Sequence, residues 1–175
     1  WLKKFNPTWY SGVPTMHQTI LERSKNNIDI IKQSRLRFIR SSSSSLAPNI
    51  MDELEETFNT CVVESYGMTE ASHQMTSNLL PPGIRKKGTV GVPTGIEVKI
   101  INTQKKTINS NKIGEIIIKG KSIINEYINN DKANKEAFIN NWFRTGDLGF
   151  VDKDGYLSIT GRIKEIINRG GEKIS

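Results

Sequence analysis

Residues 36–64 constrain the fold more than any other part of the 175-residue chain. Apolar residues predict a strand at 36–40, and five consecutive serines follow at 41–45. Apolar residues at helical spacing then predict a helix over 50–58, and a second strand is predicted at 60–64. Strands that alternate with a helix in this way form a parallel sheet. We therefore predict an α/β fold with an open sheet in this half of the chain.

The N-terminal residues extend the same pattern. Residues 8–13 predict a short strand, and Pro14 is well placed as the first residue of a helix that runs to about residue 23. His17 lies on this helix, where we expect a structural or solvent-facing histidine and not a ligand. A further strand and helix therefore join the predicted sheet.

The five serines allow two interpretations. As low-complexity sequence they would form a flexible linker. Because a strand precedes them and a helical pattern follows, a turn between strand and helix is the better interpretation. Backbone amides and hydroxyls at the start of a helix can bind anions or polar ligand groups. We therefore place Ser43 and Ser44 in a candidate site.

From about residue 88, short β-rich runs replace the helical pattern. They lie at 98–101, 115–119, 149–151 and 156–159, and Gly, Pro and Asn separate them. This spacing predicts a small antiparallel sheet or barrel, interrupted by one helix at 132–138.

The acidic turn at 152–155, D-K-D-G, has the composition of the start of a calcium-binding loop. The twelfth position of such a loop would be Ile163, where a bidentate glutamate is needed. We therefore expect a hairpin turn there.

The net charge of +7 is distributed unevenly along the chain. Residues 1–40 and 84–175 are basic, whereas residues 41–83 carry six acidic and no basic side chains. Basic flanks attract nucleic acid, but they equally attract ATP, pyrophosphate or coenzyme A. The basic residues are scattered and lack the interleaved aromatic residues on which nucleobases stack. We expect small polyanionic ligands and no nucleic acid.

Composition also bears on the cellular setting. No apolar run approaches the roughly 20 residues that a membrane-spanning helix needs, so no membrane span is expected. Cys61, the single cysteine, lies in an apolar run and is expected to be a buried core thiol in a reducing compartment. The chain starts at Trp1 without a signal-like segment. We expect part of a longer protein of the cytoplasm, with a peroxisomal location as the alternative.

Residues 65–73, S-Y-G-M-T-E-A-S-H, hold an unusual density of chemically able groups. An aromatic ring can stack on a nucleobase, and a glycine lets backbone approach a ligand closely. A hydroxyl can donate to a phosphate oxygen, and a carboxylate is the oxygen ligand that Mg²⁺ prefers. The alternative is a turn after a strand with a solvated glutamate. We favour a pocket for a nucleotide and a metal ion.

Two further clusters lie near the end of the chain. Residues 142–147, W-F-R-T-G-D, are expected to present Asp147 on a tight turn. A carboxylate held in this way can accept hydrogen bonds from both hydroxyls of a ribose. Residues 161–165, G-R-I-K-E, follow the last predicted strand with two cations, and the glycine pair Gly170-Gly171 comes after them.

In order and spacing, Y-G-M-T-E, W-F-R-T-G-D and G-R-I-K-E-I-I-N-R-G-G-E-K-I-S resemble the motifs of the adenylate-forming enzymes. This superfamily contains acyl-CoA synthetases, luciferases and the adenylation domains of peptide synthetases. The resemblance covers nearly the whole chain. The wording T-E-A-S-H-Q-M-T-S-N, with R-S-S-S-S-S-L-A-P before it, is similar to the oxalate–CoA ligase branch.

The resemblance implies a particular part of the fold. Residues 1–87 would be the C-terminal α/β portion of the large domain, residues 88–160 its small β-barrel, and residues 161–175 the hinge and the start of a mobile lid. The family's Ser/Thr/Gly-rich phosphate loop and its lid lysine have no counterpart in this sequence. We therefore expect the 175-residue chain to be inactive by itself.

The resemblance also implies roles for the nucleotide. Tyr66 would stack on adenine, Gly67 would lie against it, Thr69 would contact the α-phosphate, and Glu70 would bind Mg²⁺. Ser44 would belong to the same nucleotide site.

The later motifs would complete the catalytic cycle. Asp147 would bind the ribose hydroxyls with help from Arg162, and Lys164 would be the hinge about which the lid turns. Gly170 and Gly171 would line the channel for the pantetheine arm of coenzyme A. The implied activity joins a small carboxylic acid to coenzyme A, with ATP consumed and AMP and pyrophosphate released.

Ser43 and His73 are the candidates for recognition of the acid. A hydroxyl and an imidazole suit the second carboxylate of a very short diacid such as oxalate, whereas a long fatty acid would need apolar walls. The alternatives are that His73 has only a local structural role, that the acid is a medium- or long-chain fatty acid, or that the chain is a non-catalytic nucleotide-binding or interaction protein on the same fold.

Overall fold

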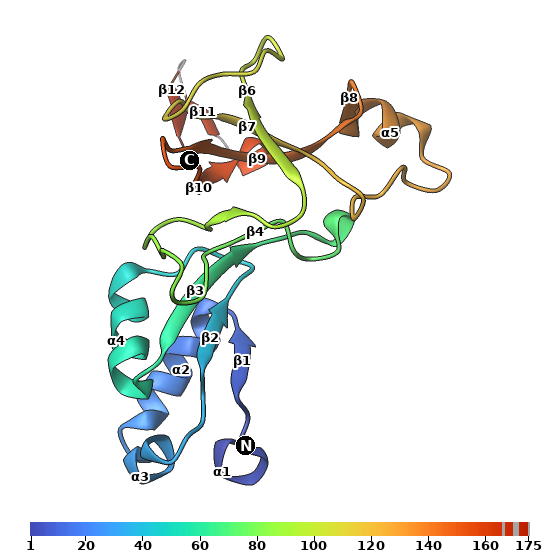
Figure 1. Ribbon diagram of the computed structural model, residues 1–175. Helices are drawn as coiled ribbons and strands as arrows, with labels where there is room; N and C mark the ends of the chain where they lie inside the picture. The colour runs from blue at the N-terminus through green and yellow to red at the C-terminus, as the bar shows by residue number, and fades with distance from the viewer. Residues whose placement is uncertain (166, 170–171, 175) are drawn as a thin grey trace.

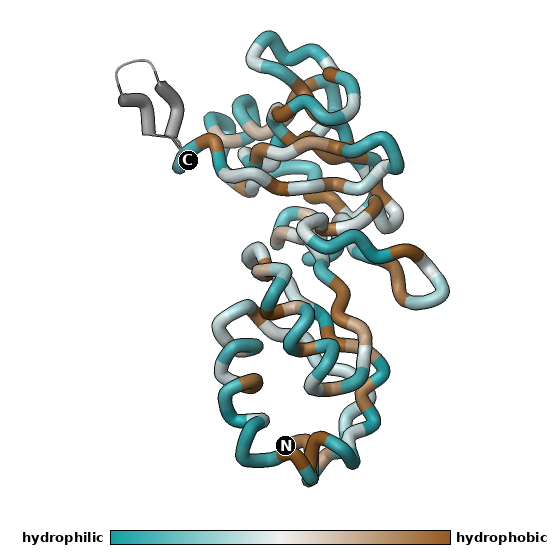
Figure 2. Tube along the Cα trace, turned by 90° about the vertical axis from the view of Figure 1, so that its left-hand side faces the viewer, coloured by the Kyte–Doolittle hydropathy of each residue, from teal (hydrophilic) through white to brown (hydrophobic). Residues whose placement is uncertain are grey.

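The computed structural model describes residues 1–165, 167–169 and 172–174. Its elements form two lobes that follow one another along the chain (Figure 1). The first lobe contains the sheet that starts with the N-terminal strand, and the second is built mainly of antiparallel strands. Figure 2 shows apolar segments, in brown, running through both lobes.

The first sheet has the strand order β1-β2-β3-β4-β5. Strands β1, β2 and β3 are parallel, and β4 and β5 continue the sheet in antiparallel fashion. The predicted α/β sheet is thereby confirmed. The elements are α1 (Leu2–Phe5), β1 (Trp9–Gly12), α2 (Pro14–Ser24), α3 (Ile28–Lys32), β2 (Phe38–Ser41), α4 (Pro48–Phe58), β3 (Cys61–Tyr66), η1 (Thr69–Ala71), β4 (Thr76–Ser77) and β5 (Val92–Pro93).

Helices α2 and α4 cover one face of the parallel strands (Figure 1). A proline occupies the first turn of each helix, where its missing N–H costs no hydrogen bond. Asn59 caps the C-terminus of α4 in the left-handed conformation, with φ 48°. The core between helices and sheet contains Leu21, Ile31, Leu36, Ile39, Leu46, Met51, Leu54, Phe58 and Val62.

His17 lies within this lobe as a structural residue. Its side chain is fully buried, and its Nδ1 atom lies 3.2 Å from the Tyr10 hydroxyl. Burial lowers the pKa of His17, and a backbone hydrogen bond with Gly12 acts in the opposite direction. The structural interpretation of this histidine is confirmed.

The second lobe is an antiparallel sheet of order β10-β9-β7-β6, with β8 also paired to β9. This arrangement confirms the predicted antiparallel β unit. Its elements are β6 (Glu97–Ile101), β7 (Gly114–Lys119), α5 (Asp131–Ala137), β8 (Phe138–Ile139), β9 (Trp142–Val151) and β10 (Leu157–Arg162). A 3₁₀ turn, η2 (Ile163–Glu165), follows, and β11 (Ile167–Arg169) pairs with β12 (Glu172–Ile174).

The second core joins the two lobes. Ile116, Ile118, Phe143 and Leu157 of the second sheet pack in one cluster with Tyr66 and Met75 of the first lobe. The end of β3 and the loop after it are therefore held between two sheets.

The acidic turn at 152–155 joins β9 to β10, which run antiparallel. An oxygen of Asp152 accepts hydrogen bonds from the amides of Asp154 and Tyr156, at 2.8 and 2.9 Å. The predicted hairpin is confirmed, and the Asp152 carboxylate serves the turn itself.

Three local predictions were wrong. Strand β3 continues to Tyr66, beyond the predicted end at residue 64, because Tyr66 pairs with Thr76 of β4. Asp147 lies inside the ten-residue strand β9 and not on a tight turn. Gly161 and Arg162 belong to β10 and do not follow it, because they pair with Leu148 and Asp147. In each case pairing between distant segments extends a strand beyond its local pattern.

Cys61 also differs from its prediction. Its side chain is only partly buried, and its thiol lies 3.5 Å from the carbonyl oxygen of Arg37. It is the first residue of β3, where the strand enters the sheet from the surface.

Within the described residues, no helix is both long and apolar enough to pass through a lipid bilayer.

Candidate functional site

A polar cleft of about 810 Å³ lies at the carboxyl ends of the parallel strands, on the side that faces the second lobe. Open α/β sheets bind ligands at this end. The cleft brings together seven of the candidate residues: Ser43, Gly67, Thr69, Glu70, His73, Arg162 and Lys164. They come from three separate segments of the chain.

The loop after β3 folds back on itself to reach the cleft. The His73 amide donates to the Met68 carbonyl oxygen at 3.0 Å, and Ser72 and His73 both adopt positive φ angles, 54° and 61°. A Cβ on Gly67 would lie 2.0 Å from the His73 carbonyl oxygen. Only glycine therefore fits at position 67, because the backbone of this loop fills the space that a side chain would need.

Glu70 is held by a segment that the motifs do not contain. The Tyr127 hydroxyl donates to Oε1 of Glu70 at 2.9 Å, and the Ile124 amide donates to the Glu70 carbonyl oxygen at 2.9 Å. Burial and this hydrogen bond raise the pKa of Tyr127 to about 12. Asn134 of α5 fixes Tyr127 in turn, through bonds of 2.7 and 2.9 Å with its amide and carbonyl.

The Glu70 carboxylate suits Mg²⁺ in a particular way. Among residues 1–165, 167–169 and 172–174, no group of three or more His, Cys, Asp or Glu side chains gathers to hold a metal ion. Mg²⁺ commonly takes one or two carboxylates and completes its octahedron with substrate phosphates and water. One carboxylate in an open polar cleft fits an ion that arrives together with a nucleotide.

Asp147 is the centre of a hydrogen-bonded chain behind the cleft. Its Oδ1 accepts from Nε of Arg162 at 2.7 Å, and its Oδ2 accepts from the Tyr66 hydroxyl. Asp147 and Tyr66 are only 3% and 7% exposed. Burial, followed by the Asp147 charge, raises the pKa of Tyr66, and the hydrogen bond to Asp147 raises the pKa of Arg162.

The bulge in β9 explains how Asp147 reaches this position. Gly146 adopts φ 73°, and the pairing of β7 with β9 shifts register at this point. A bulge re-aims the side chains around it. Arg162 lines the cleft, whereas Tyr66 and Asp147 are buried behind it and do not line it.

The turn formed by residues 42–45, the serine turn, is held by Arg40. Sequence reasoning missed this residue. Its guanidinium donates to Ser42 at 3.0 Å, to Ser11 at 3.2 Å and to Gln74 at 3.2 Å. Burial lowers the pKa of Arg40. Ser43, with φ 73°, lines the cleft, whereas Ser44 is exposed and does not.

The cleft wall in the second lobe carries an ion pair. The Arg144 guanidinium donates to the Glu115 carboxylate at 2.8 to 3.1 Å, and Glu115 is 8% exposed. Glu115 lies on β7 and Arg144 on β9, and the pairing of these strands brings the two side chains together at the cleft. No local sequence signal could have identified them.

The hinge candidate, Lys164, lies just after strand β10. Lys164 is exposed within η2 and lines the cleft. Gly170 and Gly171 lie outside the described residues.

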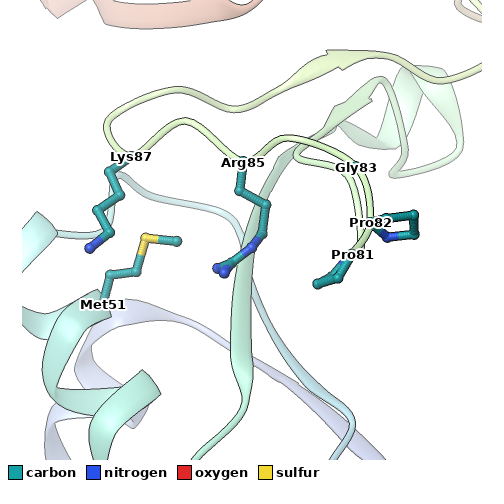
Figure 3. Close-up of a pocket in the computed structure, with 6 residues that line it drawn as sticks. All are labelled: Met51, Pro81, Pro82, Gly83, Arg85 and Lys87. Atoms are coloured by element: carbon teal, nitrogen blue, oxygen red, sulfur yellow. The ribbon is translucent and has the colours of Figure 1, made fainter.

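A second hollow, of about 210 Å³, lies away from all these residues (Figure 3). Figure 3 shows Arg85 and Lys87 on the loop above α4, with Met51 below them. Both cations already form ion pairs, Arg85 with Glu55 and Lys87 with Asp52. The residues around this hollow therefore hold the loop on α4.

Comparison with known proteins gives the class to which this fold and cleft belong. A family model described as "AMP-binding enzyme" matches residues 1–128. The chain belongs to this family of adenylate-forming enzymes, and its fold is the C-terminal part of their large domain, as predicted.

Individual relatives show which members of the family this chain resembles. The chain is 51% identical over 175 residues to an oxalate–CoA ligase of Arabidopsis thaliana, and 52% identical over 174 residues to one of Saccharomyces cerevisiae. These alignments cover 99% and 98% of this chain, but 34% and 31% of the relatives. The chain thus spans about a third of their length.

A solved structure with the same fold contains ATP and a magnesium ion. The O-succinylbenzoate coenzyme A synthetase of Bacillus subtilis, in complex with ATP and magnesium ion, superimposes with a TM-score of 0.82 at 30% identity. The match covers 99% of this chain and 35% of that one.

Proposed function

We propose that this chain forms the adenine, ribose and metal side of the active site of an ATP-dependent acid–CoA ligase. The complete enzyme would join a carboxylic acid to AMP, with release of pyrophosphate, and then transfer the acyl group to the thiol of coenzyme A. A carboxylate is a poor electrophile because a nucleophile meets its negative charge and oxide does not leave. AMP is a far better leaving group, which is why adenylation makes the thiol attack feasible.

One observation carries this proposal: Gly67, Thr69, Glu70 and Arg162 share one cleft, although Arg162 is 92 residues from Glu70. Thr69 is suited to donate to the α-phosphate, and Glu70 to hold Mg²⁺, which would neutralise phosphate charge. Arg162 lines the cleft and is suited to the ribose, and we assign Asp147 to the same role, although it is 3% exposed and its two oxygens accept from Arg162 and Tyr66. Tyr66 is the candidate for adenine stacking, although its hydroxyl is bonded to Asp147.

Coenzyme A is the proposed second substrate. The similarity to CoA ligases supports this assignment. We assign Lys164 to the hinge, Gly170 and Gly171 to the pantetheine channel, and Ser44 to the nucleotide side. A soluble setting, in the cytoplasm or a peroxisome, fits these substrates.

Oxalate, or another very short diacid, is the proposed acid. Ser43 and His73 line the same cleft as Glu70, and Arg144 lines it too, with its guanidinium paired to Glu115. The hydroxyl and the imidazole suit a second carboxylate, whereas a fatty acyl chain would need apolar walls. The likeness to oxalate–CoA ligases points in the same direction.

The acid assignment is tested in a full-length ligase that carries this sequence. We expect turnover of oxalate well above that of octanoate, and a selective loss of oxalate turnover in His73→Ala, by about ten- to a hundredfold. Ser24→Ala, which removes a buried hydroxyl of α2 that does not line the cleft, is the comparison for general damage. A preference for octanoate, or unchanged oxalate turnover in His73→Ala, would overturn oxalate and leave the ligase proposal intact.

A further inference from the structure

Three buried polar side chains form a row across the first sheet. Gly12 of β1 is in register with Ser41 of β2, and Ser41 is in register with Glu64 of β3. Register partners in parallel strands point to the same face and lie about 4.8 Å apart. The His17 ring occupies the place of a side chain on Gly12, because a Cβ there would lie 2.9 Å from its Cε1 atom.

Each of these side chains has one buried polar atom that lacks a well-aligned hydrogen-bond partner; backbone groups of Gly12 and Gly88 lie near His17 and Glu64 and oppose the effect of burial on their pKa values. The atoms are Nε2 of His17, Oγ of Ser41 and Oε2 of Glu64. The residues are 0%, 1% and 4% exposed. A buried polar atom without a hydrogen bond is costly in free energy. Three such atoms in consecutive places of one row therefore indicate that a single hydrogen-bonded network satisfies all of them.

The hydrogen-bond inventory of the row is complementary. Nδ1 of His17 faces the Tyr10 hydroxyl at 3.2 Å; if that hydroxyl donates, Nε2 carries the imidazole hydrogen and is a donor. The Ser41 hydroxyl can accept from one side and donate to the other, and Oε2 of Glu64 accepts. Burial lowers the pKa of His17 and raises that of Glu64.

The row lies directly under the serine turn and contacts both of its ends. Ser41 is the residue before the turn, and the Leu46 amide after it donates to Oε1 of Glu64 at 3.2 Å. Between these two points Ser43 adopts a positive φ and lines the cleft. We therefore expect a change in the row to move the turn.

We propose that His17, Ser41 and Glu64 form one buried hydrogen-bonded network, closed through internal water, that fixes the serine turn and so sets the position of Ser43. A buried water commonly makes about three hydrogen bonds to polar groups that are otherwise unsatisfied. The three are positioning residues and touch no substrate. At 1% exposure Ser41 is not accessible as a nucleophile, although a serine, a histidine and a carboxylate lie together.

The network itself is tested by nuclear magnetic resonance, without any activity. In protein labelled with ¹⁵N-histidine, we expect His17 to be the neutral tautomer with its hydrogen on Nε2, in slow exchange with solvent. Ser41→Ala and Glu64→Gln should each shift its ring nitrogens and speed that exchange. Ser45→Ala, the same change at an exposed serine of the turn, should leave them unchanged. A His17 spectrum that is identical in wild type, Ser41→Ala and Glu64→Gln overturns the network.

The effect on the turn rests on the proposed function and is measured in a full-length ligase. Ser41→Ala should raise KM for the acid about three- to tenfold and leave KM for ATP within about twofold. Glu64→Gln, which keeps the side-chain shape, repeats the test if Ser41→Ala does not fold. Equal changes in both KM values, or none, would overturn the positioning role. An enzyme without ligase activity would contradict the proposed function but leave the NMR result standing.

Discussion

At the scale of single residues, the cleft depends on hydrogen bonds that orient its polar side chains. Glu70 shows this most clearly, because its carboxylate meets the Tyr127 hydroxyl and its carbonyl oxygen meets the Ile124 amide. A metal ligand that is oriented by a second hydrogen bond loses little further freedom when the ion arrives.

Removal of the Tyr127 hydroxyl should therefore weaken metal binding. We expect Tyr127→Phe to raise the half-saturating Mg²⁺ concentration for pyrophosphate release about tenfold, and to weaken Mn²⁺ binding measured by electron paramagnetic resonance. Tyr156→Phe is the matched control, because that hydroxyl donates to the Ile84 carbonyl oxygen, away from the cleft residues. Equal Mg²⁺ dependence in wild type and Tyr127→Phe would rule out this role.

At the scale of elements, predictions from sequence succeed where a pattern is local. Helix α4 runs from Pro48 to Phe58, and its apolar spacing and its first proline can be read from the sequence. The extension of β9 through Asp147 could not be predicted, because it depends on a bulge and on pairing with β7 and β10. Glu70, Ser43 and His73 could be identified from their motifs. Tyr127 and Arg40 could not, because distant segments bring them in.

The loop after β4 offers a test of how elements are tied together. Arg85 donates to the Val62 carbonyl oxygen at 3.0 Å and pairs with Glu55, which also accepts from the Val62 amide at 2.8 Å. This cluster joins the loop to both α4 and β3. Lys87 and Asp52, by contrast, form an exposed pair.

We therefore expect Arg85→Ala to lower the free energy of unfolding by about 1–2 kcal/mol. Lys87→Ala, on the same loop, should produce no measurable change, because solvent screens an exposed ion pair. Urea unfolding followed by circular dichroism measures both. Comparable losses in the two variants would show that the geometry around Val62 has no special weight.

At the scale of the whole molecule, the two proposed half-reactions need different surroundings for the same cleft. Lys164 follows the last strand of the second sheet, in a short 3₁₀ turn on the cleft margin. This position suits a hinge, because backbone rotation there would move the following segment past the cleft.

Lys164→Pro should separate the two half-reactions. Proline fixes φ, so the variant should form the acyl adenylate at close to the normal rate and transfer it to coenzyme A at least about tenfold more slowly. Lys164→Ala is the control for loss of the amine alone. Single-turnover measurements of each step decide the matter, and an equal loss in both steps would argue against a hinge.

The products of ATP cleavage distinguish an AMP-forming ligase from an ADP-forming one, so product analysis is the decisive measurement. A full-length ligase that carries this sequence, given ATP, Mg²⁺, coenzyme A and oxalate, is followed by ³¹P nuclear magnetic resonance. We predict AMP and pyrophosphate in equal amounts, together with one acyl-CoA for each AMP. Formation of ADP and inorganic phosphate would contradict the account.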